Sequence, residues 1–119
     1  MRVAIVNDSP MAVEALRRSL AFQSGLKIAW TAIDGADAVA KAKADTPDLV
    51  LMDLIMPGID GVEATRRIKA AQPEATVVAW TTLDDPAAAR SFFDAGAEEF
   101  IVKHDIATLE RVLRRYCAA

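Results

Sequence analysis

The segment LVLMDLIMPGIDG, residues 49–61, joins four consecutive apolar residues to a single aspartate and then to a Pro-Gly turn. A short, continuous apolar run of this kind is typical of a strand that is covered on both faces, as in a parallel sheet. Asp53 closes the run, and residues 62–71 after the turn carry apolar side chains at helical spacing. The segment therefore predicts a strand, a loop that starts with a carboxylate, and a helix.

The same alternation extends in both directions along the chain. Further apolar runs occupy residues 3–6, 28–33, 77–80 and 100–102. Helical patterns start at Pro10, span 36–44, run from Pro86 to about residue 95, and continue from 106 to 116 after a cap that we predict at Asp105. Five consecutive strand–helix units predict an α/β fold, in which a five-stranded parallel sheet forms the middle of a three-layer sandwich.

Length and composition limit the classes of protein to consider. The 119 residues, at 12.8 kDa, fit one domain that covers residues 1–119. Fourteen basic side chains against seventeen acidic ones give a net charge of −3, which argues against direct binding of nucleic acid. No apolar run approaches the roughly 18 residues that a membrane span needs, so we expect a cytoplasmic protein without membrane contact. The single cysteine excludes an internal disulfide.

Polar side chains close the predicted strands. Asn7 and Asp8 follow the first run, Asp53 the third, Thr81 the fourth and Lys103 the fifth. Ligands of open parallel sheets bind beyond the carboxyl ends of the strands, where these side chains should meet. The carboxylates of Asp8 and Asp53 would repel each other at this edge unless a cation lay between them, and Mg²⁺ prefers oxygen ligands of this kind. Together with an ammonium and a hydroxyl, they are the groups that phosphoryl transfer requires.

Taken singly, two of these residues allow simpler interpretations. Asp53 could be an ordinary turn aspartate, and Asp8 could cap the helix that starts after Ser9-Pro10.

Over essentially its whole length the chain resembles the receiver domain of two-component response regulators, most specifically in LMDLIMPGIDG. The resemblance implies a flavodoxin-like fold with strand order 2-1-3-4-5. It also implies that Asp53 is the phosphoacceptor, that Asp8 is a direct ligand of Mg²⁺, and that the backbone carbonyl of Ile55 completes the metal shell. Asn7 stands where the family usually has an aspartate that holds a metal-bound water.

The resemblance further implies that Lys103 pairs with the phosphoryl group and that Thr81 and Phe100 form the switch. Core packing explains Phe100 equally well. The implied function is to take a phosphoryl group from a sensor histidine kinase or phosphotransfer protein, with Mg²⁺, and to change an output or partner surface. That surface is expected on the last two helices and the fifth strand.

The stretch IVNDSPMAVEALRR, with MDLIMPGIDGVEATRRI, is most similar to receivers of the chemotaxis-type methylesterase branch. The chain contains no GxSxG segment, so a methylesterase activity would lie in a separate domain. His104 replaces the proline that often follows the lysine, and a cis peptide bond is therefore not expected there.

Three alternatives stay open at this point. A degenerate receiver would act as a phosphorylation-independent interaction module, and Asn7 and His104 are compatible with it. A flavodoxin-like binding module would have the same fold without the chemistry. A haloacid-dehalogenase-type phosphatase would need a second acid two residues after the nucleophile, where this chain has Ile55.

Overall fold

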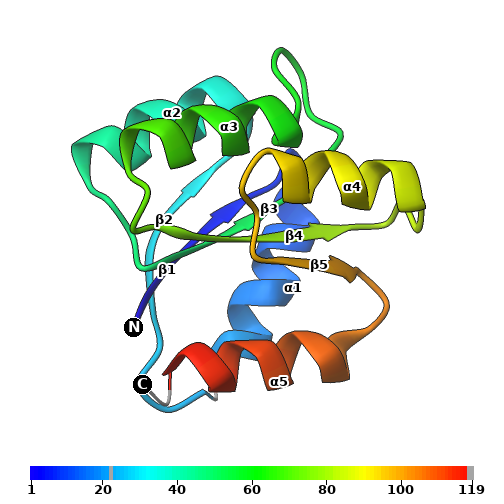
Figure 1. Cartoon of the computed structure of the whole chain (residues 1–119). Helices are drawn as coiled ribbons and strands as arrows, with labels where there is room; N and C mark the ends of the chain where they lie inside the picture. The colour runs from blue at the N-terminus through cyan, green and yellow to red at the C-terminus, as the bar shows by residue number, and fades with distance from the viewer. Residues whose placement is uncertain (22, 118–119) are drawn as a thin grey trace.

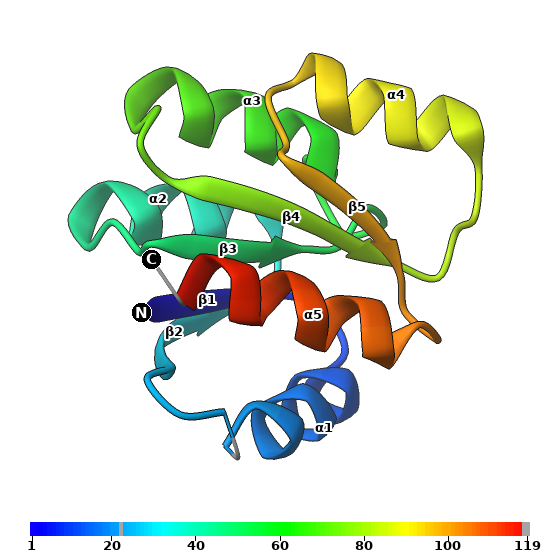
Figure 2. The same cartoon turned by 60° about the horizontal axis from the view of Figure 1, so that its bottom comes forward.

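The computed structural model describes residues 1–21 and 23–117. A five-stranded parallel sheet lies between two layers of helices, with α2, α3 and α4 on one face and α1 and α5 on the other (Figures 1 and 2). The elements in chain order are β1 (Arg2–Val6), α1 (Pro10–Leu20), β2 (Lys27–Ala32), α2 (Gly35–Ala44), β3 (Leu49–Met52), α3 (Gly61–Ala71), β4 (Thr76–Thr81), α4 (Pro86–Asp94), β5 (Glu99–Val102) and α5 (Ile106–Cys117).

The strand order is β2-β1-β3-β4-β5, and every neighbouring pair is parallel. This confirms the predicted fold class and the order that the resemblance implied. The third strand has the predicted bounds, whereas the second ends one residue earlier than expected, at Ala32. Ile33 lies outside the sheet and is exposed.

Short polar side chains start the helices. Ser9 caps α1 directly before Pro10, and Asp34, Asp60 and Asp85 cap α2, α3 and α4 by accepting hydrogen bonds from backbone N–H groups of the first turn. Such caps satisfy donors that have no partner within the helix. The predicted cap at Asp105 is confirmed, because its carboxylate accepts the Thr108 N–H at 3.1 Å.

Alternation along the strands divides the core into two parts. The α2–α4 core contains the side chains that β1, β3 and β4 direct to one face: Ala4, Val6, Val50, Met52, Val77 and Ala79. The α1–α5 core contains those directed to the other face: Val3, Ile5, Leu49, Leu51, Val78 and Trp80. Because both faces are covered, the strands are apolar on both sides, which explains their unbroken apolar runs.

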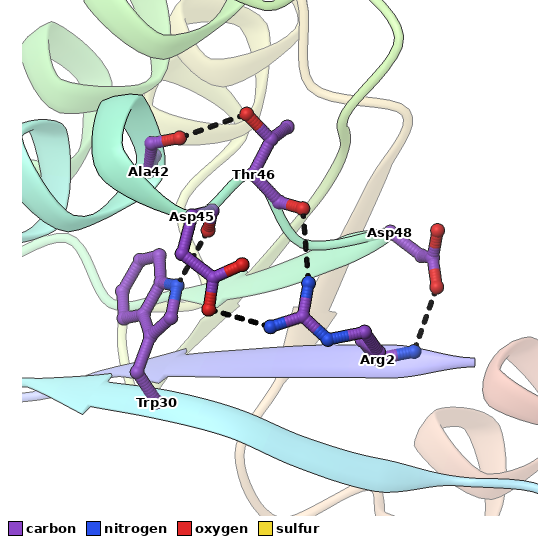
Figure 3. A network of polar contacts seen from close by, with 6 residues as sticks. All are labelled: Arg2, Trp30, Ala42, Asp45, Thr46 and Asp48. Atoms are coloured by element: carbon purple, nitrogen blue, oxygen red, sulfur yellow. Dashed lines mark hydrogen bonds and ion pairs between the residues drawn. The ribbon is translucent and has the colours of Figure 1, made fainter.

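A network of polar contacts fastens the edge of the sheet at which the strands begin (Figure 3). The Arg2 guanidinium donates to the Asp45 carboxylate at 2.6 Å and to the Thr46 carbonyl at 3.3 Å. The Trp30 indole N–H donates to the Asp45 carbonyl at 2.9 Å, and the Arg2 N–H donates to Asp48 at 2.7 Å. The end of α2 is thus tied to β1 and β2, and β1 is tied to the residue before β3, far from the carboxyl ends of the strands.

No helix in the described part of the chain is long and apolar enough to span a membrane. Among the same residues no peptide bond is cis, which agrees with the expectation for the Lys103–His104 bond.

Candidate functional site

Buried polar residues gather at the carboxyl ends of the strands, which we call the carboxyl edge. Within residues 1–21 and 23–117, four polar or charged residues are buried: Asn7, Asp53, Thr65 and Thr81. The Thr65 hydroxyl lies inside α3 and donates to the Gly61 carbonyl. The other three all lie at the carboxyl edge. Because burying polar groups is costly without partners, such a cluster indicates a functional site.

Backbone hydrogen bonds fix three of the predicted site residues just beyond the strands. The N–H groups of Asn7, Asp53 and Lys103 donate to the last residues of neighbouring strands, at Ala32 O (3.0 Å), Val6 O (3.1 Å) and Thr81 O (2.8 Å). Each bond extends the sheet ladder by one residue. The backbone positions of these residues are therefore set by the sheet rather than by flexible loops.

The Asp53 carboxylate meets the Lys103 ammonium, as the sequence predicts. Asp53 Oδ1 accepts the N–H of Leu54 at 2.9 Å, and Oδ2 lies 3.3 Å from Lys103 Nζ. Both side chains are largely buried, with 10% and 17% of their surfaces exposed. The separation exceeds the roughly 2.7–2.9 Å of a tight charge-assisted hydrogen bond, so the ammonium is attracted to the carboxylate without being locked to it.

Asn7 is buried beneath the first loop, whereas Asp8 is exposed. The Oδ1 atom of Asn7 accepts the Ser9 N–H at 2.9 Å, and its Nδ2 atom has no hydrogen-bond partner among the described residues. The interpretation of Asp8 as a helix cap is wrong, because the Ser9 hydroxyl accepts the Ala12 N–H instead. The Asp8 carboxylate is consequently not used by the cap of α1.

Thr81 and Phe100 lie on the face of the sheet that α2, α3 and α4 cover. Thr81 is the last residue of β4 and pairs with Val102, and its hydroxyl accepts the Leu83 N–H at 3.3 Å. Phe100 packs against the α2–α4 core, with its ring 6.0 Å from that of Phe92. The structure shows the packing of Phe100, and its role in switching stays a prediction.

Gly61 holds the loop after β3 close to the sheet. Its N–H donates to the Leu54 carbonyl at 2.8 Å, and a Cβ at this position would lie 1.8 Å from the Asp53 carbonyl oxygen. Only a residue without a side chain permits this approach. The start of α3 thus positions the backbone of Asp53 directly, a contact that the sequence analysis did not predict.

The family model of the response regulator receiver domain matches residues 3–114. The chain belongs to the receiver domain family of response regulators. Its resemblance to the chemotaxis-type branch is also confirmed: a protein-glutamate methylesterase/protein-glutamine glutaminase of Pseudomonas syringae pv. syringae is 57% identical over 95 residues. That match covers 80% of this receiver and 28% of the relative's length.

Solved structures agree with the assignment. The response regulator domain of Thermotoga maritima CheB is 26% identical, with a TM-score of 0.91, and the match covers 100% of this receiver and 97% of that chain. The CheX–CheY–BeF3–Mg²⁺ complex of Borrelia burgdorferi matches at 32% identity with a TM-score of 0.85, covering 97% of this receiver and 87% of that chain.

Proposed function

We propose that this receiver takes a phosphoryl group on Asp53 from a phosphohistidine of a sensor kinase or phosphotransfer protein in the cytoplasm. The observation that carries the proposal is the Lys103 ammonium 3.3 Å from Asp53 Oδ2, in a pocket where both side chains are largely buried. A carboxylate poised beside a fixed cation is suited to nucleophilic attack on a phosphorus atom and to holding the charge that arrives with it.

The transfer uses few groups of the protein. A carboxylate oxygen of Asp53 forms the new P–O bond while the P–N bond to the donor histidine breaks, and the electron pair of that bond returns to the imidazole. Lys103 neutralises negative charge on the transferring oxygens. Thr81 supports the switch, since its hydroxyl can leave the Leu83 N–H and donate to a phosphoryl oxygen.

The residues present fit Mg²⁺. Among the described residues no group of three His, Cys, Asp or Glu side chains is placed to hold a metal. Mg²⁺ does not require one, because it commonly takes one or two carboxylates, several waters and a phosphate. Asp8, Asp53 and the carbonyl of Ile55 would supply the protein ligands, and the ion would neutralise charge on the phosphoryl oxygens.

Exposed apolar side chains favour a protein as the phosphodonor. Six large apolar residues are exposed in the described chain, and five of them lie in the loops or first helical turns of the carboxyl edge: Met11, Ile33, Ile55, Leu83 and Ile106. Large apolar side chains that are exposed along one edge of the sheet are available to pack against a protein partner. The output surface is proposed on α4, β5 and α5, where Phe93 of α4 is exposed as well.

The test is incubation with acetyl phosphate and Mg²⁺, followed by intact-mass measurement. We expect a mass increase of one phosphoryl group. Failure to add phosphate under these conditions would favour the degenerate receiver, and sustained turnover of a phosphomonoester would favour the phosphatase.

Asn7→Asp is expected to tighten Mg²⁺ binding by at least about fivefold, because one more negative charge about 4 Å from the ion contributes about 1 kcal/mol even at the dielectric constant of bulk water. A carboxylate can still accept the Ser9 N–H, so the loop should be retained. Calorimetric titration measures the change, with Asp8→Asn as the matched variant that weakens binding. An unchanged dissociation constant in Asn7→Asp would show that position 7 does not contribute to the metal site.

A further inference from the structure

Asp53, Trp80 and Lys103 lie on one face of three neighbouring strands. Trp80 packs in the α1–α5 core from the middle strand, β4. Leu51 and Ile101 lie in the same α1–α5 core. Asp53 comes two residues after Leu51, and Lys103 comes two residues after Ile101. Strand alternation therefore directs all three side chains to the same face. To reach Asp53 beyond β3, the Lys103 side chain has to cross β4.

The Lys103 side chain crosses β4 over the Trp80 ring. Lys103 Nζ lies 5.1 Å from the centroid of the ring and 3.3 Å from Asp53 Oδ2. The first distance lies within the range of cation–π attraction, for which Trp is the strongest aromatic partner. The ammonium is thus held from two sides, by a carboxylate and by an aromatic face.

Trp80 itself is held by packing. Only 6% of its surface is exposed, and its indole N–H has no acceptor among the described residues. A buried indole N–H usually finds a partner. Within the described chain, the indole therefore acts through its packing and its ring face rather than through a hydrogen bond.

We propose that Trp80 is a positioning residue that holds the Lys103 ammonium at the Asp53 carboxylate. The inference deepens the proposed function and rests on it. A lysine side chain carries its ammonium on a flexible stem of four methylene groups, and it loses much conformational entropy when the ammonium is held in one place. Its ion pair with Asp53 is loose, so without the aromatic face the ammonium would spend part of its time in solvent.

Three variants separate positioning from packing. Trp80→Phe keeps an aromatic face, Trp80→Met keeps apolar bulk without one, and Lys103→Met removes the cation. The phosphorylation rate with acetyl phosphate is expected to fall about fivefold in Trp80→Met and to stay within about twofold of wild type in Trp80→Phe. Because Trp80 acts through Lys103, adding Trp80→Met to Lys103→Met should change the rate no further.

A second measurement needs no phosphorylation. In the wild type, NMR should show ordered Lys103 side-chain methylenes with upfield ring-current shifts from the indole. The shifts and the order should be lost in Trp80→Met and retained in Trp80→Phe.

Three results would overturn the proposal. The first is a Lys103 side chain that NMR shows to be equally ordered in Trp80→Met and in the wild type, and the second is a phosphorylation rate of Trp80→Met equal to that of the wild type. The third is a double variant whose loss of rate is the sum of the two single losses. If the wild type takes no phosphate, the proposed function fails, and the NMR comparison alone then decides whether Trp80 positions Lys103. If Trp80→Met does not fold, a Trp80→Phe protein with mobile Lys103 signals would contradict the proposal equally.

Discussion

Asp53→Asn should abolish the mass increase of one phosphoryl group on incubation with acetyl phosphate and Mg²⁺. The amide is nearly isosteric and can still accept the Leu54 N–H through its oxygen, so the fold should persist. It lacks the negative charge and the nucleophilic oxygen that attack on phosphorus requires. Intact-mass measurement over time therefore gives a rate for the wild type and none for the variant.

Asp60→Asn is the matched control for this experiment. Asp60 lies in the same loop, but its carboxylate accepts the Glu63 N–H as the cap of α3. Asparagine caps helices as well as aspartate does, so this variant should be phosphorylated at close to the wild-type rate. An Asp53→Asn protein that still gained phosphate at the wild-type rate would place the acceptor on another residue.

Gly61→Ala is expected to lower the free energy of unfolding by about 3 kcal/mol, the upper range for overpacking. The added Cβ would lie 1.8 Å from the Asp53 carbonyl oxygen and 2.8 Å from its carbonyl carbon. These are backbone atoms fixed by the hydrogen bond from Asp53 N–H to Val6 O, and no rotamer change can relieve the clash. Urea denaturation measures the loss, and the folded fraction should also be phosphorylated more slowly.

Gly58→Ala separates the clash from the general effect of replacing a glycine in this loop. Gly58 has a φ of +79°, and a Cβ there would have no atom within 4 Å. The cost should be that of a left-handed backbone alone, about 1 kcal/mol. If Gly61→Ala proved no less stable than Gly58→Ala, the close approach of α3 to Asp53 would not constrain the fold.

The sequence predicts the elements well because strands covered on both faces leave unbroken apolar runs. The one-residue error at Ile33 has a physical cause, since an apolar residue directly after a strand extends the run without being buried. The strand order followed only from the resemblance, because alternation of strands and helices does not specify which strands are neighbours.

For the site, residue types at the strand ends predicted that Asp53 and Lys103 meet, because parallel strands end at one edge. They did not predict the aromatic ring against which the Lys103 ammonium packs. Trp80 was part of the apolar run of residues 77–80, and its place beneath the ammonium requires the order of β3, β4 and β5 to be known. Similarly, the composition of the first loop could not show that the Asn7 amide oxygen accepts a hydrogen bond from the Ser9 N–H.

The consecutive residues Trp80 and Thr81 give β4 a sensitivity to insertions and deletions. The Trp80 side chain lies on the α1–α5 face of the sheet, beneath Lys103, and the Thr81 side chain lies on the α2–α4 face. Deleting a single residue upstream in β4 would turn each side chain to the opposite face of the sheet, putting the hydroxyl beneath the cation and the indole among the side chains of the α2–α4 core. We therefore expect β4 to tolerate substitutions far better than insertions or deletions, whatever residue is inserted or removed.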